Sequence, residues 1–401
     1  MKKYTIVVIL GLLAFHSASA QKIVIDGRLE GIEDSTHISL FKEEGNVGTR
    51  VAGDSVVNGH FHIEYTPQND HTEKYSLMSS DKGFPSMSLP LWAKKGTEIN
   101  IKGKDKLIYT WSVESNAPEQ KEWSYFIQSN IDSLNAYQRL AVTRKALVDK
   151  IINGENVSKT ERKQIKMRMD SLDKASKVVD RSVQEKNLAL LQKGKMNPVR
   201  MEVLSRVASS IKWDSVEAFR APVTKLYNKL TPEEKNSVHG QEIALILYPP
   251  HIVKAGEPMY DTLLTDLAGR TYHLADFKGR YILLDFWSYG CGPCHASVPE
   301  MKEIAEKLKD SLTVVSLSSD NRKMWKEASD YFKMTWNNLS DGQENRGIYA
   351  KYGVTVIPNY VLIAPDGTIK DIWTGYYGEG SLKSKIKELT GFVVAADMKK
   401  E

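Results

Sequence analysis

The chain has only two cysteines in 401 residues, and just two residues separate them in the segment Cys291-Gly292-Pro293-Cys294. No cysteine remains to join distant segments, so apolar cores must hold the fold together. Because 41% of the residues are hydrophobic, the chain can build such cores without disulfide staples. A disulfide between two cysteines this close can form and break without disturbing a fold, which indicates redox chemistry rather than a structural role.

The N-terminal segment has the features of a secretory signal peptide. Lys2 and Lys3 precede an apolar run from Ile6 to Phe15, and an Ala-x-Ala site ends at Ala20. The run is too short to span a bilayer comfortably, and no cysteine follows the cleavage site to carry a lipid. We therefore expect residues 1–20 to be cleaved after Ala20, leaving a periplasmic protein that is not embedded in the membrane.

Charge argues against a nucleic-acid partner. The chain carries 55 Lys and Arg against 50 Asp and Glu, and the two signs are interspersed rather than clustered. A nucleic-acid surface is therefore not expected. The length predicts two or three domains after the signal peptide.

Residues 21–115 have the pattern of a β-sandwich-like domain. Short apolar runs alternate with turn residues, and Asn58-Gly59 within residues 56–63 indicates a hairpin. Residues 97–103 alternate between polar and apolar side chains, as a half-buried strand does. We expect these strands to form a module of their own.

Residues 116–248 change to a helical period. Apolar side chains recur every three or four residues from Trp123 to Tyr137, and again from Ile165 to Val183. Helix starts are predicted at Ser158, at Asn197-Pro198 and at Thr231-Pro232. The second stripe fits an internal helix pair better than a coiled-coil partner surface, although the sequence leaves the oligomeric state open.

Residues 251–392 alternate between strands and helices, which predicts an α/β domain with a mixed sheet. Apolar runs of strand length occur at residues 281–286, 312–317 and 359–363, and a further strand is expected at 369–373. Helical patterns follow the cysteines and recur at residues 323–332 and 381–389. The two cysteines lie where the first of these strands ends and a helix begins.

That position suits thiol–disulfide exchange. A helix N-terminus offers unpaired N–H groups and partial positive charge, which stabilise a thiolate. We expect Cys291 at the exposed edge of the turn as the nucleophile, and Cys294 one turn into the helix to resolve the mixed disulfide. Gly292 and Pro293 supply the tight turn and the helix start.

Five further residues are candidates for the same site. Asp285 closes an apolar strand, where burial should raise its pKa and suit it to moving the Cys294 proton. Trp287 and Tyr289 are expected to shape an apolar lip beside the cysteines. The Ile357-Pro358 bond precedes a strand and would offer its backbone to an extended substrate if it were cis, although local sequence alone favours trans.

These residues strongly resemble thioredoxin-fold proteins. The resemblance rests on Asp285-Phe286-Trp287, Cys291-Gly292-Pro293-Cys294, Pro299 and Val356-Ile357-Pro358. Segments 256–280 and the helix before Tyr352-Gly353-Val354 resemble the exported TlpA-like branch. Over roughly residues 251–392, the resemblance implies a mixed sheet flanked by helices, a nucleophilic Cys291, a resolving Cys294, a buried Asp285 and a cis Pro358. Residues 22–247 more weakly resemble the extension found ahead of such domains in exported bacterial proteins.

Two positions depart from that branch. Gly290 stands where many members have Trp, which should leave Cys291 more open. Ser297 stands where many have Glu, which removes one candidate buried acid and argues against a specialised role in cytochrome maturation. The Gly-Pro pair between the cysteines resembles the reducing members, which implies a reductase of protein disulfides. A disulfide oxidase or isomerase is the alternative within the family.

Other chemistries fit less well. Cys291-x-x-Cys294-His295 matches the haem-attachment signature, but it follows an apolar strand and has a Gly-Pro linker. One Cys-x-x-Cys supplies only half of a zinc site, and His60-x-His62 is more simply a solvated hairpin. The Pro- and Thr-rich cysteine loop of a peroxidase is absent. We interpret His295 as a surface helix residue that tunes local charge, and we expect no metal or organic cofactor.

The sequence hypothesis is an exported thiol–disulfide oxidoreductase that acts on cysteine pairs of other proteins. A reductase outside the cytoplasm would need electrons from a membrane thiol donor. The alternative is an envelope ligand-binding or receptor protein in which residues 21–247 recognise the ligand and the redox domain is accessory. The direction of electron flow, the substrate and the donor stay open at this point.

Overall fold

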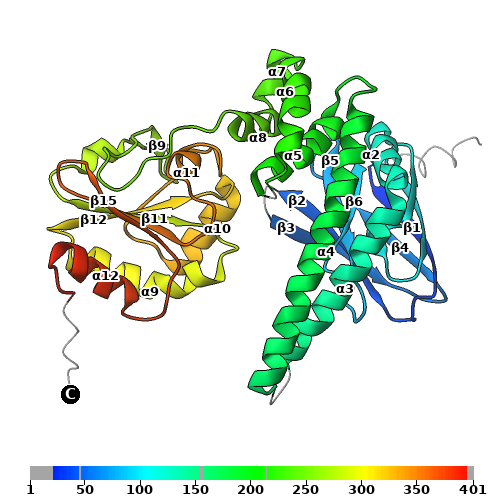
Figure 1. Ribbon diagram of the computed structural model, residues 1–401, viewed down its shortest axis with the longest axis horizontal. Coiled ribbons are helices and arrows are strands. Elements are labelled where there is room, and N and C mark those ends of the chain that lie inside the picture. Colours follow the sequence, from blue (N-terminus) through cyan, green and yellow to red (C-terminus); the bar gives the residue numbers. More distant parts are fainter. Residues whose placement is uncertain (1–20, 45–46, 154–156, 214, 395–401) are drawn as a thin grey trace, which may run out of the picture. The chain divides into compact units, whose positions relative to one another are not determined.

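A computed structural model describes residues 21–44, 47–153, 157–213 and 215–394. The predicted signal peptide, residues 1–20, lies outside the described residues. The chain divides into two compact units, Met1–Leu247 and Tyr248–Glu401 (Figure 1). Among the described residues, no helix has both the length and the apolar character that crossing a bilayer requires.

The first unit begins with two four-stranded sheets that share one core, which confirms the sandwich-like, sheet-rich prediction. One sheet has the order β4-β1-β7-β8 and the other β3-β2-β5-β6. Alternate residues of β1 and β7 are buried, as expected for strands with one solvated face. The bounds are β1 (Ile23–Glu30), β2 (His37–Glu44), β3 (Val47–Ser55), β4 (His60–Tyr65), β5 (Glu73–Met78), β6 (Leu89–Ala93), β7 (Glu98–Lys104) and β8 (Ser112–Ser115).

The predicted hairpin around Asn58-Gly59 is correct only for its turn. Both turn residues have positive φ, +50° and +73°, and Val57 and His60 exchange two backbone hydrogen bonds. The arms then separate, since β3 pairs with β2 while β4 pairs with β1 in the other sheet. Val56 explains the divergence: its side chain is fully buried and its N–H donates to Thr36 O, so the chain crosses the core here.

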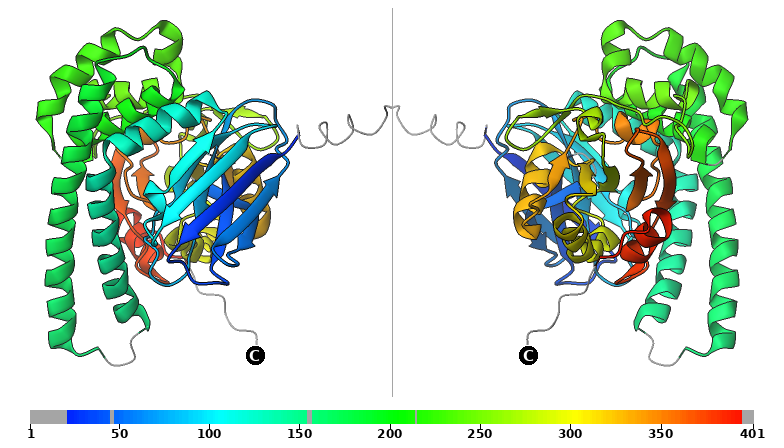
Figure 2. Two further views of the ribbon diagram at one scale, coloured as in Figure 1. Left: turned by 90° about the vertical axis from the view of Figure 1, so that its right-hand side faces the viewer. Right: turned by 90° about the vertical axis from the view of Figure 1, so that its left-hand side faces the viewer.

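The helical part of the first unit contains the predicted helix pair. The two long helices α3 and α4 lie side by side (Figures 1 and 2), which confirms an internal pair for the second apolar stripe. The bounds are η1 (Ile108–Thr110), α2 (Pro118–Ser129), α3 (Ile131–Asn153), α4 (Lys159–Leu191), α5 (Pro198–Trp213), η2 (Glu217–Phe219), α6 (Arg220–Asn228), α7 (Pro232–Asn236) and α8 (Val238–Leu247).

Helix starts were predictable from the local sequence, but the break between the helices α2 and α3 was not. Ser158 and Thr231 each accept a hydrogen bond from the N–H three residues on, as expected of N-caps. The stripe from Trp123 to Tyr137 is interrupted at Asn130, which separates α2 from α3. The buried Asn130 amide donates to Phe126 O and to Asn187 Oδ1, and so competes with the regular helical pattern.

The second unit is a mixed five-stranded sheet of order β13-β12-β11-β14-β15, which confirms the predicted fold class. β11, β12 and β13 are parallel, whereas β14 and β15 run antiparallel to their neighbours. The bounds are β9 (Leu264–Thr265), β10 (Thr271–Tyr272), η3 (Leu274–Phe277), β11 (Tyr281–Trp287), α9 (Gly292–Lys307), β12 (Leu312–Ser318), α10 (Arg322–Phe332), β13 (Asn337–Leu339), α11 (Ile348–Lys351), β14 (Asn359–Ile363), β15 (Ile369–Thr374) and α12 (Ser381–Thr390).

Two apolar clusters cover the two faces of this sheet. Leu283 packs with side chains of α9 and α12, while Leu284 packs with α11 and with the segments that precede β11. Because side chains alternate along a strand, Asp285 shares the face of Leu283, which α9 covers. The central strand therefore directs one carboxyl towards the helix that carries the cysteines.

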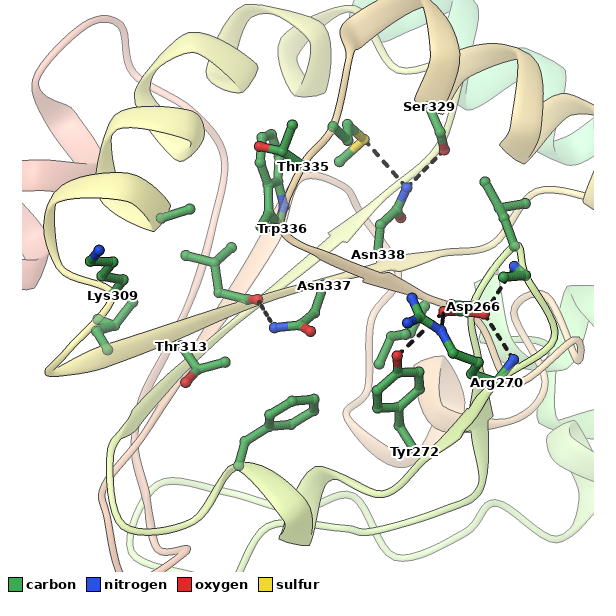
Figure 3. A pocket seen from close by; sticks show the side chains of 18 of the residues that line it. Asp266, Arg270, Tyr272, Lys309, Thr313, Ser329, Thr335, Trp336, Asn337 and Asn338 are labelled. Carbon is green, nitrogen blue, oxygen red and sulfur yellow. Dashed lines mark hydrogen bonds and ion pairs between the residues drawn. The ribbon is translucent and has the colours of Figure 1, made fainter.

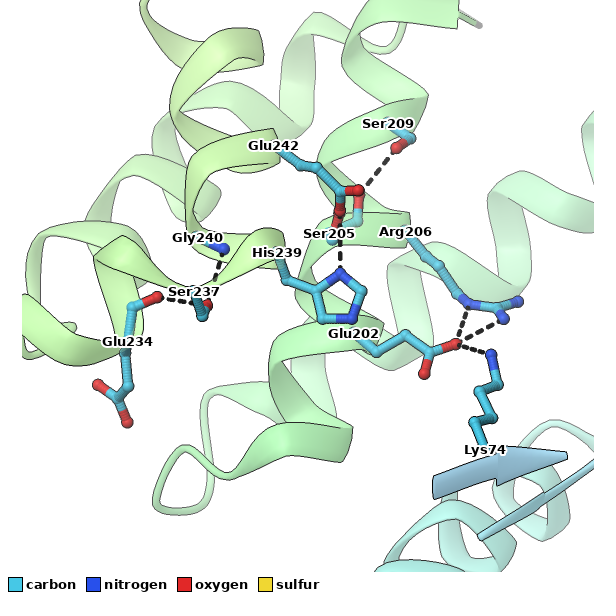
Figure 4. A network of polar contacts seen from close by, with 10 residues as sticks. All are labelled: Lys74, Glu202, Ser205, Arg206, Ser209, Glu234, Ser237, His239, Gly240 and Glu242. Atoms are coloured by element: carbon cyan, nitrogen blue, oxygen red, sulfur yellow. Dashed lines mark hydrogen bonds and ion pairs between the residues drawn. The ribbon is translucent and has the colours of Figure 1, made fainter. Parts of the chain in front are cut away.

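A buried ion network ties the sandwich to the helices in the first unit. Glu202 of α5 accepts from Lys74 of β5 at 2.7 Å and from Arg206 at 2.7 Å (Figure 4). Burial opposes the charged form of Glu202, but Arg206 and Lys74 outweigh it and hold its pKa below the usual value. Removing this carboxylate would leave two cations without their shared partner.

We expect Glu202→Gln to destabilise the first unit by about 2–3 kcal/mol at neutral pH. A depressed carboxyl pKa contributes stability above the unfolded value, so the difference should shrink as the pH falls through the pKa of Glu202. Urea unfolding followed by far-UV circular dichroism measures it. The matched control is Glu185→Gln, which breaks an exposed pair with Arg181 and should cost less than about 1 kcal/mol. Equal losses in both variants would contradict a structural role for the network.

Candidate functional site

The two cysteines are joined in a disulfide at the turn between β11 and α9. Cys291 is the N-cap of α9, and its sulfur accepts a hydrogen bond from the Cys294 N–H at 3.2 Å. Pro293 occupies the first turn, where its missing N–H costs no hydrogen bond. The predicted placement of both sulfurs at a helix N-terminus is therefore what the structure has.

Cys291 is more enclosed than the sequence suggested. Its exposed fraction is 8% and that of Cys294 is 2%, whereas Gly292 and Pro293 between them are exposed. The expectation that Cys291 lies at an exposed edge of the turn is wrong for this disulfide form, while the effect of Gly290 in place of Trp stays a prediction. An apolar cluster surrounds the sulfurs and supplies the physical reason; its members are Trp287, Trp325, Ala328 and the half-buried Leu267, Tyr289, Phe332, Met334 and Ile357.

The residues expected to form the apolar lip differ in how deeply they are buried. Tyr289 and Ile357 are half-buried, so part of each side chain reaches the surface beside the disulfide. Trp287 is only 2% exposed and lies beneath them. Pro358 is buried, and the Ile357–Pro358 peptide bond is cis, as the family resemblance implied and local sequence did not.

Asp285 is buried on the central strand and has a single hydrogen-bond partner. Ser316, its neighbour in the parallel β11–β12 register, donates from Oγ to Asp285 Oδ2 at 2.8 Å. Among the described residues, Oδ1 has no partner. Burial raises the pKa of Asp285 to about 7, and the Ser316 hydrogen bond only partly opposes this shift. A carboxyl with such a pKa can exchange a proton near neutrality.

Sequence reasoning missed the polar groups at the end of β12. The carboxyl of Asp320 accepts from the Tyr289 N–H at 2.8 Å and from Ser318 Oγ at 3.0 Å, and burial raises its pKa. Tyr349 Oη lies 2.8 Å from Trp287 O and 2.7 Å from Leu317 O, at the ends of β11 and β12. The signal was present, because polar residues that end neighbouring parallel strands meet at one sheet edge.

His295, which we interpreted as a surface residue, is half-buried and serves the turn. Its Nε2 contacts Tyr289 O, and its ring centroid lies 4.6 Å from that of Phe332. The ring thus braces the backbone of the turn against α10.

Ser297, where related proteins often have Glu, donates to Cys294 O at 2.8 Å. The structure has another buried acid one turn further along α9. Glu300 is 2% exposed and accepts hydrogen bonds from the N–H groups of Gly380 and Lys383 at the start of α12. Its contacts make it a helix cap rather than part of the cysteine site.

The histidine pair of the first unit lies on an exposed sheet face. His62 Nδ1 pairs with Asp26 Oδ1 at 2.8 Å, and that hydrogen bond raises the pKa of His62. Over the described parts of the chain, no group of three or more His, Cys, Asp or Glu side chains has an arrangement suited to a metal ion.

Comparisons with known proteins match the second unit. A family model described as thioredoxin-like matches residues 279–369. The chain is 28% identical over 138 residues to the thioredoxin-like protein YneN of Bacillus subtilis, covering 33% of this chain and 79% of that protein. It is 30% identical over 125 residues to the thiol-disulfide oxidoreductase ResA of Geobacillus kaustophilus, covering 31% of this chain and 71% of that protein.

One similar solved structure is the thioredoxin domain of a thiol-disulfide oxidoreductase from Bacteroides vulgatus. It is 26% identical, covers 34% of this chain and 99% of that domain, and has a TM-score of 0.32.

We expect Asp285→Asn to stabilise the oxidised protein above pH 7. The folded pKa of about 7 exceeds the ordinary value of 3.8, so wild-type stability falls as the pH rises between these values. The difference should approach about 4 kcal/mol as an upper limit at pH 8 and vanish near pH 4. Thermal unfolding of the second unit at both pH values measures it. Asp310→Asn, at an exposed carboxyl, is the control and should show no such pH dependence. Parallel pH curves for wild type and Asp285→Asn would refute the raised pKa.

Proposed function

Because the chain belongs to the thioredoxin-like family and is a thiol-disulfide oxidoreductase, we propose that it reduces disulfides of other proteins through Cys291 and Cys294. The observation that carries the proposal is the disulfide at the N-terminus of α9, together with a buried carboxyl on β11, the strand that leads into this turn. A bond between residues three apart can form and break without moving either β11 or α9. The pair is therefore built to cycle.

In the reduced protein, Cys291 is the attacking group. Its proton leaves to solvent, and the partial positive charge of the α9 N-terminus stabilises the thiolate. The thiolate attacks one sulfur of a substrate disulfide, forming a mixed disulfide and releasing the other substrate sulfur as a thiolate that takes up a proton. Gly292 and Pro293, both exposed, leave room for the substrate to approach.

Cys294 then completes the exchange. Asp285 accepts the Cys294 proton, and the Cys294 thiolate attacks Cys291 Sγ in the mixed disulfide. The bond between Cys291 and the substrate breaks as the Cys291–Cys294 bond forms, and the departing substrate thiolate takes the proton from Asp285. The substrate gains two electrons and two protons, and the protein dithiol loses the same number.

Substrate docking is assigned to the half-buried side chains beside the disulfide. Tyr289 and Ile357 offer apolar surface to an extended segment, and the backbone at Ile357-Pro358 offers it hydrogen bonds. Trp287 supports this surface from below, since it is nearly fully buried. Specificity would then depend on backbone shape near the substrate disulfide more than on its side chains.

We further propose that the protein is exported and acts as a reductase outside the cytoplasm. The support for export is the leader sequence at residues 1–20, and mature protein that begins at Gln21 would bear it out. Each catalytic cycle leaves the Cys291–Cys294 pair oxidised, so turnover requires a dithiol donor. A membrane protein carrying such a dithiol is the donor class that fits an exported reductase.

Replacing each cysteine by serine separates the two steps. Cys294→Ser should retain attack by Cys291 but stop at the mixed disulfide, because no second thiol remains to resolve it. When the reduced variant is mixed with insulin, whose disulfides are the substrate, the trapped complex should appear on non-reducing gels. Dithiothreitol should release it. Cys291→Ser is the matched control and should form no such adduct. Full disulfide-reducing activity in Cys291→Ser would overturn the mechanism.

The direction of electron flow can be read from the reduction potential of the pair. A reductase should have a potential near about −270 mV, the range of thioredoxin. Alkylation of free thiols after equilibration in redox buffers gives this value for the full chain. A potential near about −120 mV would instead indicate an oxidant, and the proposed direction would be wrong.

A further inference from the structure

Asp285 ends a short chain of hydrogen bonds that begins outside the cysteine site. The indole N–H of Trp336, just before β13, donates to Ser316 Oγ at 2.8 Å. Ser316 Oγ in turn donates to Asp285 Oδ2 at 2.8 Å. Ser316 has no exposed surface, so solvent does not compete for either bond. The three groups therefore form a continuous relay across the α9-covered side of the sheet.

Donor and acceptor chemistry fixes the direction of this relay. An indole N–H can only donate, so the Ser316 oxygen must accept from Trp336. The single Ser316 hydroxyl proton is then left for the carboxylate. We propose that Ser316 and Trp336 are positioning residues for Asp285: Trp336 anchors the Ser316 hydroxyl in the orientation that donates to Oδ2. This inference rests on the proposed role of Asp285 in moving the Cys294 proton.

The relay also divides the work between the two carboxyl oxygens. Oδ2 is held by Ser316, while Oδ1 has no partner among the described residues. A proton taken up by Asp285 can therefore reside on Oδ1 without breaking the Ser316 bond. The carboxyl keeps one orientation in both protonation states, which suits a group that accepts and returns a proton.

The groups around Asp285 make the Ser316 hydrogen bond important for the charge state of its carboxyl. Tyr349 of α11 and Tyr360 of β14 interact with Asp285; burial is the main cause of the raised pKa of each tyrosine, and the Asp285 carboxyl adds to it. The neighbouring acids Asp320 and Glu300 act on these same tyrosines. In the reduced protein, the Cys294 thiol of α9 would be a further titratable group on this side of the sheet. Burial raises the pKa of Asp285, and the Ser316 hydrogen bond is the one influence found to oppose it.

Trp336 reaches this relay from the wall of a cavity. It is half-buried and lines a cavity of about 680 Å³ together with Thr313, Asn337 and Asn338 (Figure 3). Asn337 and Asn338 have other partners, Val314 O and Ser329 Oγ. The indole therefore links a polar, open part of the domain to the buried carboxyl of Asp285 through a single serine.

The test is a direct titration of the Asp285 carboxyl by ¹³C NMR in the oxidised full-length protein, labelled at aspartate and assigned with Asp285→Asn. Ser316→Ala removes the donor to the carboxylate and should raise the midpoint by on the order of one unit. Trp336→Phe leaves the hydroxyl present but unanchored, and should raise the midpoint by on the order of a few tenths of a unit.

Two comparisons make the test specific. Thr313→Val is the matched control, since it removes a buried hydroxyl from the same strand that has no hydrogen-bond partner in the described structure, and it should leave the midpoint unchanged. Because Trp336 acts through Ser316, the double variant should match Ser316→Ala alone. An unchanged midpoint in Ser316→Ala, or a Trp336→Phe shift that persists in full without Ser316, would overturn the relay.

The same variants distinguish the relay from the proposed function. If the NMR midpoint shifts and the pH profile of single-turnover insulin reduction shifts with it, both stand. If the NMR midpoint shifts and the rate profile does not, the relay stands but Asp285 does not move the Cys294 proton. Should Ser316→Ala fail to fold, Trp336→Phe and Thr313→Val still decide the relay.

Discussion

The parallel ladder between β11 and β12 sets the geometry on which the redox site depends. It aligns Asp285 with Ser316 and Trp287 with Ser318, so the two strands deliver their polar groups to one edge. The Tyr349 hydroxyl bonds to both strand ends, at Trp287 O and Leu317 O. The turn that carries the cysteines is thus fixed at its base, and α9 starts from a defined position.

At this edge of the sheet, burial outweighs the neighbouring groups that favour ionised carboxylates. Asp285 and Asp320 both have raised pKa values, and in each case burial is the largest cause. Glu202 in the first unit shows the opposite outcome, because Lys74 and Arg206 lower its pKa despite burial. The same protein therefore keeps one buried acid ionised, where it stabilises the fold, and gives another a pKa near neutral pH, where it can exchange protons.

The sequence alone predicted the features that depend on residues close together along the chain. The N-caps at Ser158 and Thr231 and the Asn58-Gly59 turn are local devices, and they occur where expected. What failed depends on packing between segments: the strands on either side of the turn join different sheets, and an apolar cluster encloses Cys291.

The relay was hidden from sequence for a related reason. Ser316 meets Asp285 only through the register of two strands, and Trp336 reaches Ser316 only through the edge position of β13. Apolar periodicity locates β11 and β12 but carries no information on which residues stand opposite each other. The cis bond at Pro358 became an expectation through family resemblance alone.

Confining both cysteines to one turn separates redox chemistry from folding. The two apolar clusters of the first unit and the two on the sheet faces of the second contain no cysteine; the sulfurs belong only to the small cluster around Trp287 and Trp325. We therefore expect the four larger cores to stay intact when the disulfide opens, with the α9 N-terminus available to stabilise a thiolate. A pair that bridged distant segments would instead couple each catalytic cycle to the stability of the fold. Oxidation and reduction of the pair therefore change the charge only near the two sulfurs, and under the proposed mechanism the Asp285 carboxyl takes up the proton that is moved.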